Sequence, residues 1–140
     1  MLLVPKLAFD LLSDAEEAYK EFGKFSDETL QVLYDVFNNT FSKAVEFLET
    51  GEALQYETAK GTRRLLKVSD KHELYMLFPD INFCYCPVFK HQVLKQQKLI
   101  TCKHVLVAKL AKIQNIIRSE VVTDSQLVDL LNETIEYVRN

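Results

Sequence analysis

The sequence predicts an α+β fold, because the spacing of its apolar side chains changes twice along the 140 residues. In residues 1–52 and again after residue 104, apolar side chains recur three and four positions apart, which is typical of amphipathic helices. In residues 53–78 they alternate with polar ones, which is typical of short strands. The length suits one domain with a buried core. We expect a single domain at 1–140, with a helical part at 1–52, a strand-containing part at 53–118 and a C-terminal helix at 119–140.

The helical part divides into three helices, whose ends are marked by residues suited to caps and breaks. Gly23 suits the end of the first helix, Ser26 the start of the second and Gly51 the end of the third. Asn38 and Asn39 predict a break between the second and the third. The side chains expected to face the core are Leu7, Leu11, Ala15, Ala18, Phe22, Leu30, Leu33, Tyr34, Phe37, Phe41, Ala44, Val45 and Leu48.

The strand-containing part predicts a small antiparallel β-meander of three short strands. Turns are expected at 59–62 and 69–71, and they are too short for a crossover connection, so the strands must run antiparallel. Pro87 lacks a backbone donor and suits the first turn of a short helix at about 88–96. The alternating side chains that predict the strands are Leu54, Tyr56, Thr58, Leu66, Val68, Leu74, Met76 and Phe78.

Two further helices are expected after the strands. The first has Leu106, Leu110, Ile113 and Ile117 on one face. The second begins after residues 123–126, where Thr and Gln have the spacing of a capping box. Its inward face should consist of Leu127, Leu130, Leu131, Ile135 and Val138.

All three cysteines and one histidine fall into a compact motif: Cys84-x-Cys86, fifteen residues, then Cys102-x-His104. Three thiolates and one imidazole are the four ligands that a tetrahedral structural Zn²⁺ takes. The alternative is that the three cysteines are ordinary core residues. The motif therefore predicts Zn²⁺ as a cofactor, held where the meander leads into the C-terminal helices.

Backbone geometry indicates how each ligand pair could bind one ion. Cys84 and Cys86 would point to the same side of an extended strand. In mid-helix, Cys102 and His104 would point to nearly opposite sides, so we expect them in a loop or in the first turn of a helix. His91 is the alternative to His104 as fourth ligand. Since structural zinc contributes on the order of 10 kcal/mol, metal binding should be coupled to folding.

The predicted ligand set argues against catalysis. A hydrolytic zinc keeps one position open for water and usually has a carboxylate nearby. Here four protein ligands would close the site, and no acidic residue lies between Cys84 and His104. Gly23, Gly51 and Gly61 are not followed by the Lys-Ser/Thr pair of a nucleotide-binding P-loop. We therefore expect that this chain is not an enzyme.

The motif resembles the SWIM zinc-binding motif, which is CxC, a variable spacer and CxH. Residues 86–89 (Cys-Pro-Val-Phe), 93–94 (Val-Leu) and 99–106 (Leu-Ile-Thr-Cys-Lys-His-Val-Leu) resemble the small SWIM-type subunit of the Shu recombination complex. The resemblance covers residues 64–112, about a third of the chain. One departure is Val107, which stands where the family often has a small residue, with Ala108 next.

The resemblance implies a function in homologous recombination and DNA repair. SWIM-type Shu subunits form a heterodimer with a RecA-like recombinase paralog, an ATPase, and the pair promotes assembly of recombinase filaments on single-stranded DNA. The resemblance also implies a nuclear location, and thiolate ligands independently favour a reducing compartment. Residues 1–5 are apolar but lack a basic start and a cleavage site, so we expect neither a secretory signal nor a membrane span.

Charge is unevenly distributed along the chain. Residues 1–59 carry 4 basic and 12 acidic side chains, net −8; residues 60–118 carry 12 and 3, net +9; residues 119–140 carry 1 and 5, net −4. The basic segment could contact nucleic acid or a partner, which makes a direct single-stranded DNA-binding zinc module the alternative function. Internal charge pairing is the other explanation. The candidate contact residues are Arg63, Arg64, Lys67, Lys90, Lys95, Lys98, Lys103, Lys109 and Lys112.

Three aromatic residues lie around the expected ligands. Phe83, Tyr85 and Phe89 could stack on nucleobases, as aromatic side chains do in single-strand binders. They could instead shield the thiolates from water, which is the interpretation we favour.

Overall fold

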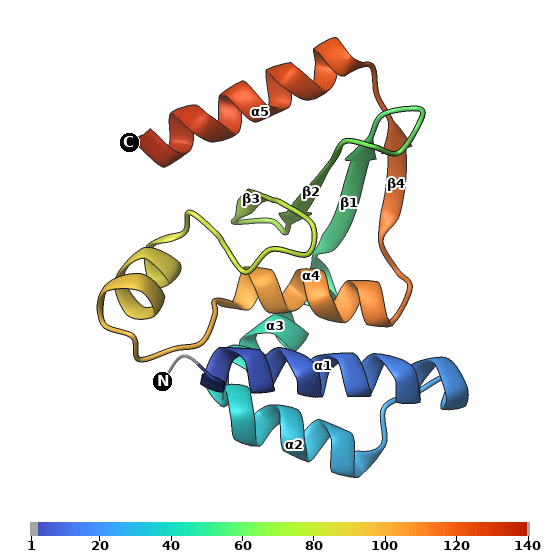
Figure 1. Ribbon diagram of the computed structural model, residues 1–140, viewed down its shortest axis with the longest axis vertical. Helices are drawn as coiled ribbons and strands as arrows, with labels where there is room; N and C mark the ends of the chain where they lie inside the picture. Colours follow the sequence, from blue (N-terminus) through green and yellow to red (C-terminus); the bar gives the residue numbers. More distant parts are fainter. Residues whose placement is uncertain (1–2, 140) are drawn as a thin grey trace.

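The computed structural model describes residues 3–139, with the side chains of residues 5–135. It confirms an α+β fold with helices on both sides of a small sheet (Figure 1). No helix in these described ranges has both the length and the apolar character that crossing a bilayer requires. The elements are α1 (Leu3–Phe22), α2 (Asp27–Phe37), α3 (Asn39–Thr50), β1 (Glu52–Glu57), β2 (Arg64–Ser69), β3 (Leu74–Leu77), the π-helix η1 (Phe89–Lys95), α4 (Lys103–Ile113), β4 (Arg118–Val121) and α5 (Asp124–Arg139).

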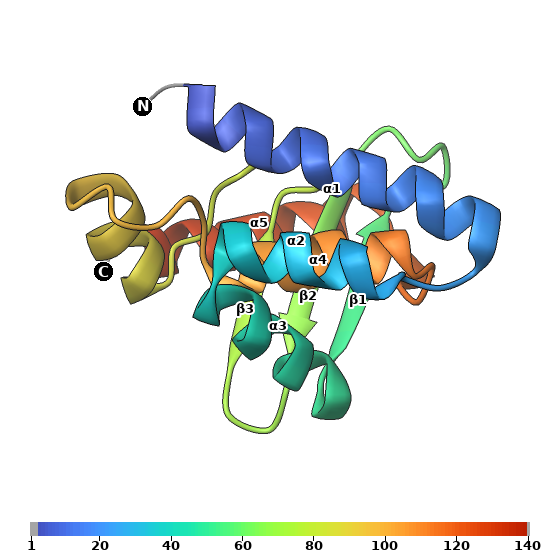
Figure 2. The ribbon, with the colours of Figure 1, turned by 90° about the horizontal axis from the view of Figure 1, so that it is seen from below.

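Helix α4 lies at the centre of the fold. One side of it packs on β1 and β2, and the other packs on α1 and α3, so that α4 separates the sheet from the N-terminal helices (Figures 1 and 2). A helix covered on opposite sides must be apolar nearly all round. Its sequence meets that demand, since its buried residues are His104, Val105, Leu106, Val107, Leu110, Ala111 and Ile113.

The two faces of the sheet pack against different partners because side chains alternate along each strand. Leu66 and Val68 of β2 face the main core with α4, whereas Leu65 faces the opposite side. There it forms a second cluster with Met76 and Leu127 of α5. Helix α5 therefore covers the sheet face that α4 leaves open (Figure 1).

The sheet has one strand more than the predicted meander. β1, β2 and β3 pair antiparallel as expected, but β4 pairs parallel to β1, with Leu54 opposite Arg118, and the order is β3-β2-β1-β4. The expectation of a helix from residue 119 is therefore wrong, since that helix begins at Asp124. The alternation rule could not detect β4 because all four of its residues are exposed.

The predicted caps and the break between α2 and α3 are confirmed, but α4 ends at Ile113 and does not include Ile117. The Ser26 hydroxyl accepts a hydrogen bond from the Thr29 amide at 3.1 Å, and Asn38 has a positive φ of 53° at the break between α2 and α3. Thr123 and Gln126 exchange two hydrogen bonds, of 2.9 and 3.1 Å, which is the capping box. The short helix after Pro87 is also present, but it is a π-helix.

On several elements the buried face differs from the face that the sequence predicts. On α1 the buried side chains are Ala8, Leu12 and Ala15, while Leu7 and Phe22 are exposed. The reason is that two neighbouring stripes of α1 are apolar, and contact with α4 selects one of them. Five more residues that the sequence places in the core are exposed, namely Leu30, Tyr34, Val45, Leu74 and Ile135. On α5 the buried residues are Leu127 and Thr134, whereas the predicted Val138 lies outside the described side chains.

We predict that Gly51→Ala destabilises the fold more than Gly61→Ala. A Cβ at Gly51 would lie 2.6 Å from the Ser69 carbonyl oxygen and 2.7 Å from that of Phe47, and neither backbone atom can move easily. Overlap of this kind should cost about 3 kcal/mol. Gly61 has a positive φ of 70° but open space around it, so its substitution should cost about 1 kcal/mol. Urea unfolding of both variants measures the difference, and equal midpoints would contradict it.

Candidate metal centre

Cys84 and Cys86 lie in the irregular segment that follows β3. The segment from Phe78 to Tyr85 forms no strand, so the expectation that a strand carries CxC is wrong in detail. The two thiols nevertheless reach the same point, as they would from a strand, because both belong to one cluster of ligand atoms. Cys84 and Cys86 are 1% and 2% exposed, and their side chains point into the core.

Cys102 and His104 lie at the start of α4, as the sequence predicts. Cys102 is the residue before the helix and is extended, with φ −100° and ψ 169°, while His104 belongs to the first turn. The change from extended to helical backbone between them lets both side chains face the same point. They are 1% and 3% exposed.

The structure brings the four predicted ligands together. Their ligand atoms all lie within 4.8 Å of one another, and the Cys84 Sγ is 3.8 Å from the His104 Nδ1. Around a tetrahedral zinc with Zn–S near 2.3 Å and Zn–N near 2.0 Å, neighbouring ligand atoms are roughly 3.5 to 3.8 Å apart. The donor set and its spacing therefore fit Zn²⁺. His91 is exposed on η1 and does not belong to the cluster.

The three thiols are too close together to titrate independently. Hydrogen bonds from Cys102 and Cys84 lower the pKa of the Cys86 thiol. Hydrogen bonds with Cys102 and Cys86, together with burial, raise the pKa of Cys84. The protein alone thus favours one thiolate and holds back further ionisation, whereas a divalent cation would compensate all three thiolate charges.

Two aromatic rings hold the His104 imidazole in place. Phe47 of α3 meets it edge-on at a centroid distance of 5.8 Å, and Tyr75 of β3 lies against it at 4.3 Å. Burial, followed by the nearby Cys86 and Cys84 thiols, raises the pKa of Tyr75 to about 12. The Tyr75 hydroxyl therefore stays neutral and adds no charge beside the sulfurs.

The aromatic residues around the motif pack against other rings, as the shielding interpretation expects. Phe89 is 1% exposed and meets Phe83 edge-on at 5.6 Å. Tyr85 lies 5.0 Å from Tyr75, and its hydroxyl accepts a hydrogen bond from the Met76 amide. These contacts and the burial of Phe89 leave no broad ring face of Phe89 for a nucleobase.

Glu73 is a site residue that sequence reasoning missed. Its Oε1 lies 3.3 Å from the His104 Nε2, and its Oε2 forms an ion pair of 2.8 Å with Lys103. A histidine that binds metal through Nδ1 carries its proton on Nε2, so His104 would donate to Glu73. Glu73 precedes His104 by 31 residues, and no local pattern relates the two.

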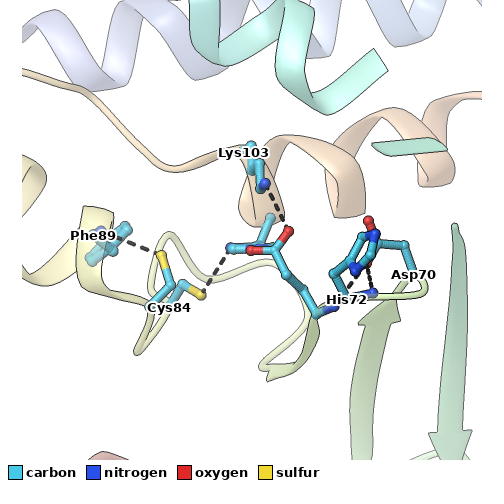
Figure 3. Close-up of polar contacts among 8 residues, drawn as sticks. Asp70, His72, Cys84, Phe89 and Lys103 are labelled. Atoms are coloured by element: carbon cyan, nitrogen blue, oxygen red, sulfur yellow. Dashed lines mark hydrogen bonds and ion pairs between the residues drawn. The ribbon is translucent and has the colours of Figure 1, made fainter. Parts of the chain in front are cut away.

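A turn presents Glu73 to the metal ligands. The Asp70 carboxylate accepts hydrogen bonds from the His72 and Glu73 amides, both at 2.8 Å, and these bonds lower the pKa of Asp70. Figure 3 shows this turn beside Lys103, which extends from the start of α4. The turn between β2 and β3 thus places a carboxylate next to the imidazole.

The structure divides the predicted contact residues among several locations. Arg64 and Lys112 both pair with Asp80, and hydrogen bonding from Lys112 lowers the pKa of that carboxyl. Lys103 pairs with Glu73. Lys67 and Lys109 lie over the rings of Tyr56 and Phe9, and Arg63 is exposed in the β1–β2 turn. Lys90, Lys95 and Lys98 lie together on or just after η1.

We predict that Cys102→Ser and His104→Ala abolish zinc binding and unfold the region around α4. Removing one ligand weakens a site whose binding free energy is on the order of 10 kcal/mol and belongs to folding. Elemental analysis and thermal melting followed by circular dichroism measure the two effects. His91→Ala is the control and should keep the zinc content of the parent chain. Loss of zinc from His91→Ala with retention in His104→Ala would reverse the assignment.

We predict that Glu73→Gln weakens zinc binding by about tenfold, because His104 loses a charged hydrogen-bond acceptor. Competition with a coloured zinc chelator measures the affinity. Glu52→Gln is the matched control, since Glu52 pairs with Arg118 at 2.7 Å on the surface. Lys103→Met removes the ion pair with Glu73 but keeps the contact between Glu73 and His104, so it distinguishes the effects of the two contacts. Equal zinc affinities for Glu73→Gln and Glu52→Gln would contradict the role of Glu73.

Comparison with known proteins finds relatives that are named for a zinc finger of the SWIM type. The chain is 25% identical over 130 residues to zinc finger SWIM domain-containing protein 7 of Homo sapiens, which spans 93% of both chains, and the figures for the Danio rerio protein are the same. It is 30% identical over 89 residues to a homolog from Dictyostelium discoideum, covering 63% of this chain and 57% of that protein. No family model matches the chain, and no solved structure matches it significantly. The ligand motif and the geometry of the cluster support zinc binding, and the similarity to these relatives supports a SWIM-type zinc-finger protein.

Proposed function

We propose that the chain is a non-catalytic, zinc-stabilised adaptor subunit of a Shu-like complex in the nucleus. The observation that carries the first part is the closure of the metal site. All four ligands come from the protein, and each is at most 3% exposed. A hydrolytic zinc needs a position open to water and substrate, and such burial leaves little room for one. The role of the zinc ion would be structural, since it would hold the start of α4 against the segment that carries Cys84 and Cys86.

The proposed partner is a RecA-like recombinase paralog, in a heterodimer that promotes recombinase filament assembly in homologous recombination. Support comes from the resemblance of the motif and its flanks to the SWIM-type subunit of Shu complexes, and from the similarity to SWIM domain-containing relatives over 93% of the chain. Nucleotide hydrolysis would reside in the partner, since this chain has no P-loop sequence.

The placement of the basic residues favours the adaptor over a direct single-stranded DNA-binding module. Arg64, Lys103 and Lys112 neutralise carboxylates of the same chain. A backbone-tracking site needs a continuous row of available cations. DNA would then be reached through the complex and not mainly through this chain.

We predict that the chain co-elutes with a RecA-like paralog from the same organism when the two are expressed together. The chain alone should bind labelled oligothymidylate weakly in fluorescence anisotropy at low and high salt. Cys102→Ser should abolish co-elution, because the adaptor surface requires the folded zinc site, whereas His91→Ala should not. Tight, strongly salt-dependent binding of the lone chain, without co-elution of the paralog, would contradict the adaptor and support the DNA-binding module.

A further inference from the structure

A groove of about 490 Å³ lies between the end of α2, η1 and the segment that leads into α4. Its apolar lining comes from both sides, with Val36 and Phe37 on α2 and Phe89, Val93 and Leu94 on η1. Helix η1 is the olive coil at the side of the molecule in Figure 1, and its Phe89 and Val93 connect this wall of the groove to the main core.

Hydrogen bonds at the zinc ligands or next to them hold both ends of the groove wall. At one end, the Phe89 amide donates to the Cys86 Sγ at 3.4 Å. At the other end, Thr101 precedes Cys102, and its hydroxyl donates to Asn82 Oδ1 at 2.7 Å. Asn82 Nδ2 also donates to the Ile100 carbonyl at 3.2 Å. The groove should therefore be largely preformed whenever the metal site is intact.

Three exposed lysines lie on or just after η1, the helix that forms one wall of the groove. Among the residues described, no carboxylate pairs with Lys90, Lys95 or Lys98, and residues 81–119 include no acidic residue. Lys98 lines the groove directly. In η1 the Gln96 amide donates to the His91 carbonyl five residues earlier, and this π-helical spacing brings Lys90 and Lys95 to one side.

Apolar side chains remain exposed beside these lysines. Leu94 is 56% exposed and also lines the groove, and Val88 just before η1 is 39% exposed. A leucine that is half accessible between cations can contribute to a contact by desolvation, while the cations select the charge of the partner.

We propose that this groove docks an acidic peptide segment of a partner protein, which inserts a large apolar side chain between α2 and η1 while its carboxylates face Lys90, Lys95 and Lys98. Charge complementarity argues for the acidic partner, and the aliphatic lining argues for an apolar anchor. Nucleic acid fits less well, because single-strand sites present exposed aromatic faces and Phe89 is only 1% exposed. The proposal holds whether or not the partner is a recombinase paralog.

Selection of a random peptide library displayed on phage, with the zinc-loaded full-length chain as the target, tests the proposal. The enriched peptides should combine a large apolar residue with flanking Asp or Glu. A synthetic fluorescein-labelled copy of the most enriched peptide is then titrated with each variant in fluorescence anisotropy. Leu94→Ala and Lys98→Glu should each weaken its binding by about tenfold.

Matched controls separate the groove from general surface effects. Leu74→Ala removes a leucine that is 54% exposed on β3, and Lys60→Glu makes the same charge change in the exposed β1–β2 turn. Both should leave binding unchanged, and all four variants should keep their zinc. The proposal is overturned if no acidic peptide is enriched, if Leu94→Ala and Lys98→Glu bind as the parent chain does, or if oligothymidylate displaces the peptide and binds more tightly than it.

Discussion

The rest of the structure depends on the contact between two short segments, residues 84–86 and 102–104, at one buried point. Cys102 and His104 begin α4, so whatever holds them also fixes where the central helix starts and which way it faces. The sheet packs on one side of α4, and α1 and α3 pack on the other. A shift at the ligands would therefore be transmitted to both layers, because a close-packed interior has little free volume to absorb it.

The metal ligands could be predicted because their chemistry restricts them to few residue types at short spacings. Helix caps at Ser26 and Thr123 were predictable for the same reason, since a local hydrogen bond determines them. Features that depend on contacts between distant segments could not be predicted. Glu73 reaches His104 only because the β2–β3 turn folds beside α4. β4 pairs with β1 although most of the sheet-forming part of the chain lies between them.

The distribution of charge on the surface likewise could not be predicted from the sequence. The sequence indicates a basic central segment, but it does not reveal which cations are already neutralised. Asp80 pairs with Arg64 and Lys112, and Glu73 pairs with Lys103, whereas the lysines around η1 have no carboxylate partner among the described residues. A net charge counted along the chain thus describes composition, while the surface potential depends on which carboxylates the fold brings near.

The fourth strand has a consequence for how copies of the chain meet one another. β4 closes one side of the sheet, it is only four residues long, and it carries Arg118 and Glu120. Unpaired strand edges invite sheet extension into aggregates, and short charged edge strands oppose it. Arg118 is also held to Glu52 by an ion pair. This border of the sheet should therefore resist edge-to-edge stacking and help to keep the protein dispersed at high concentration.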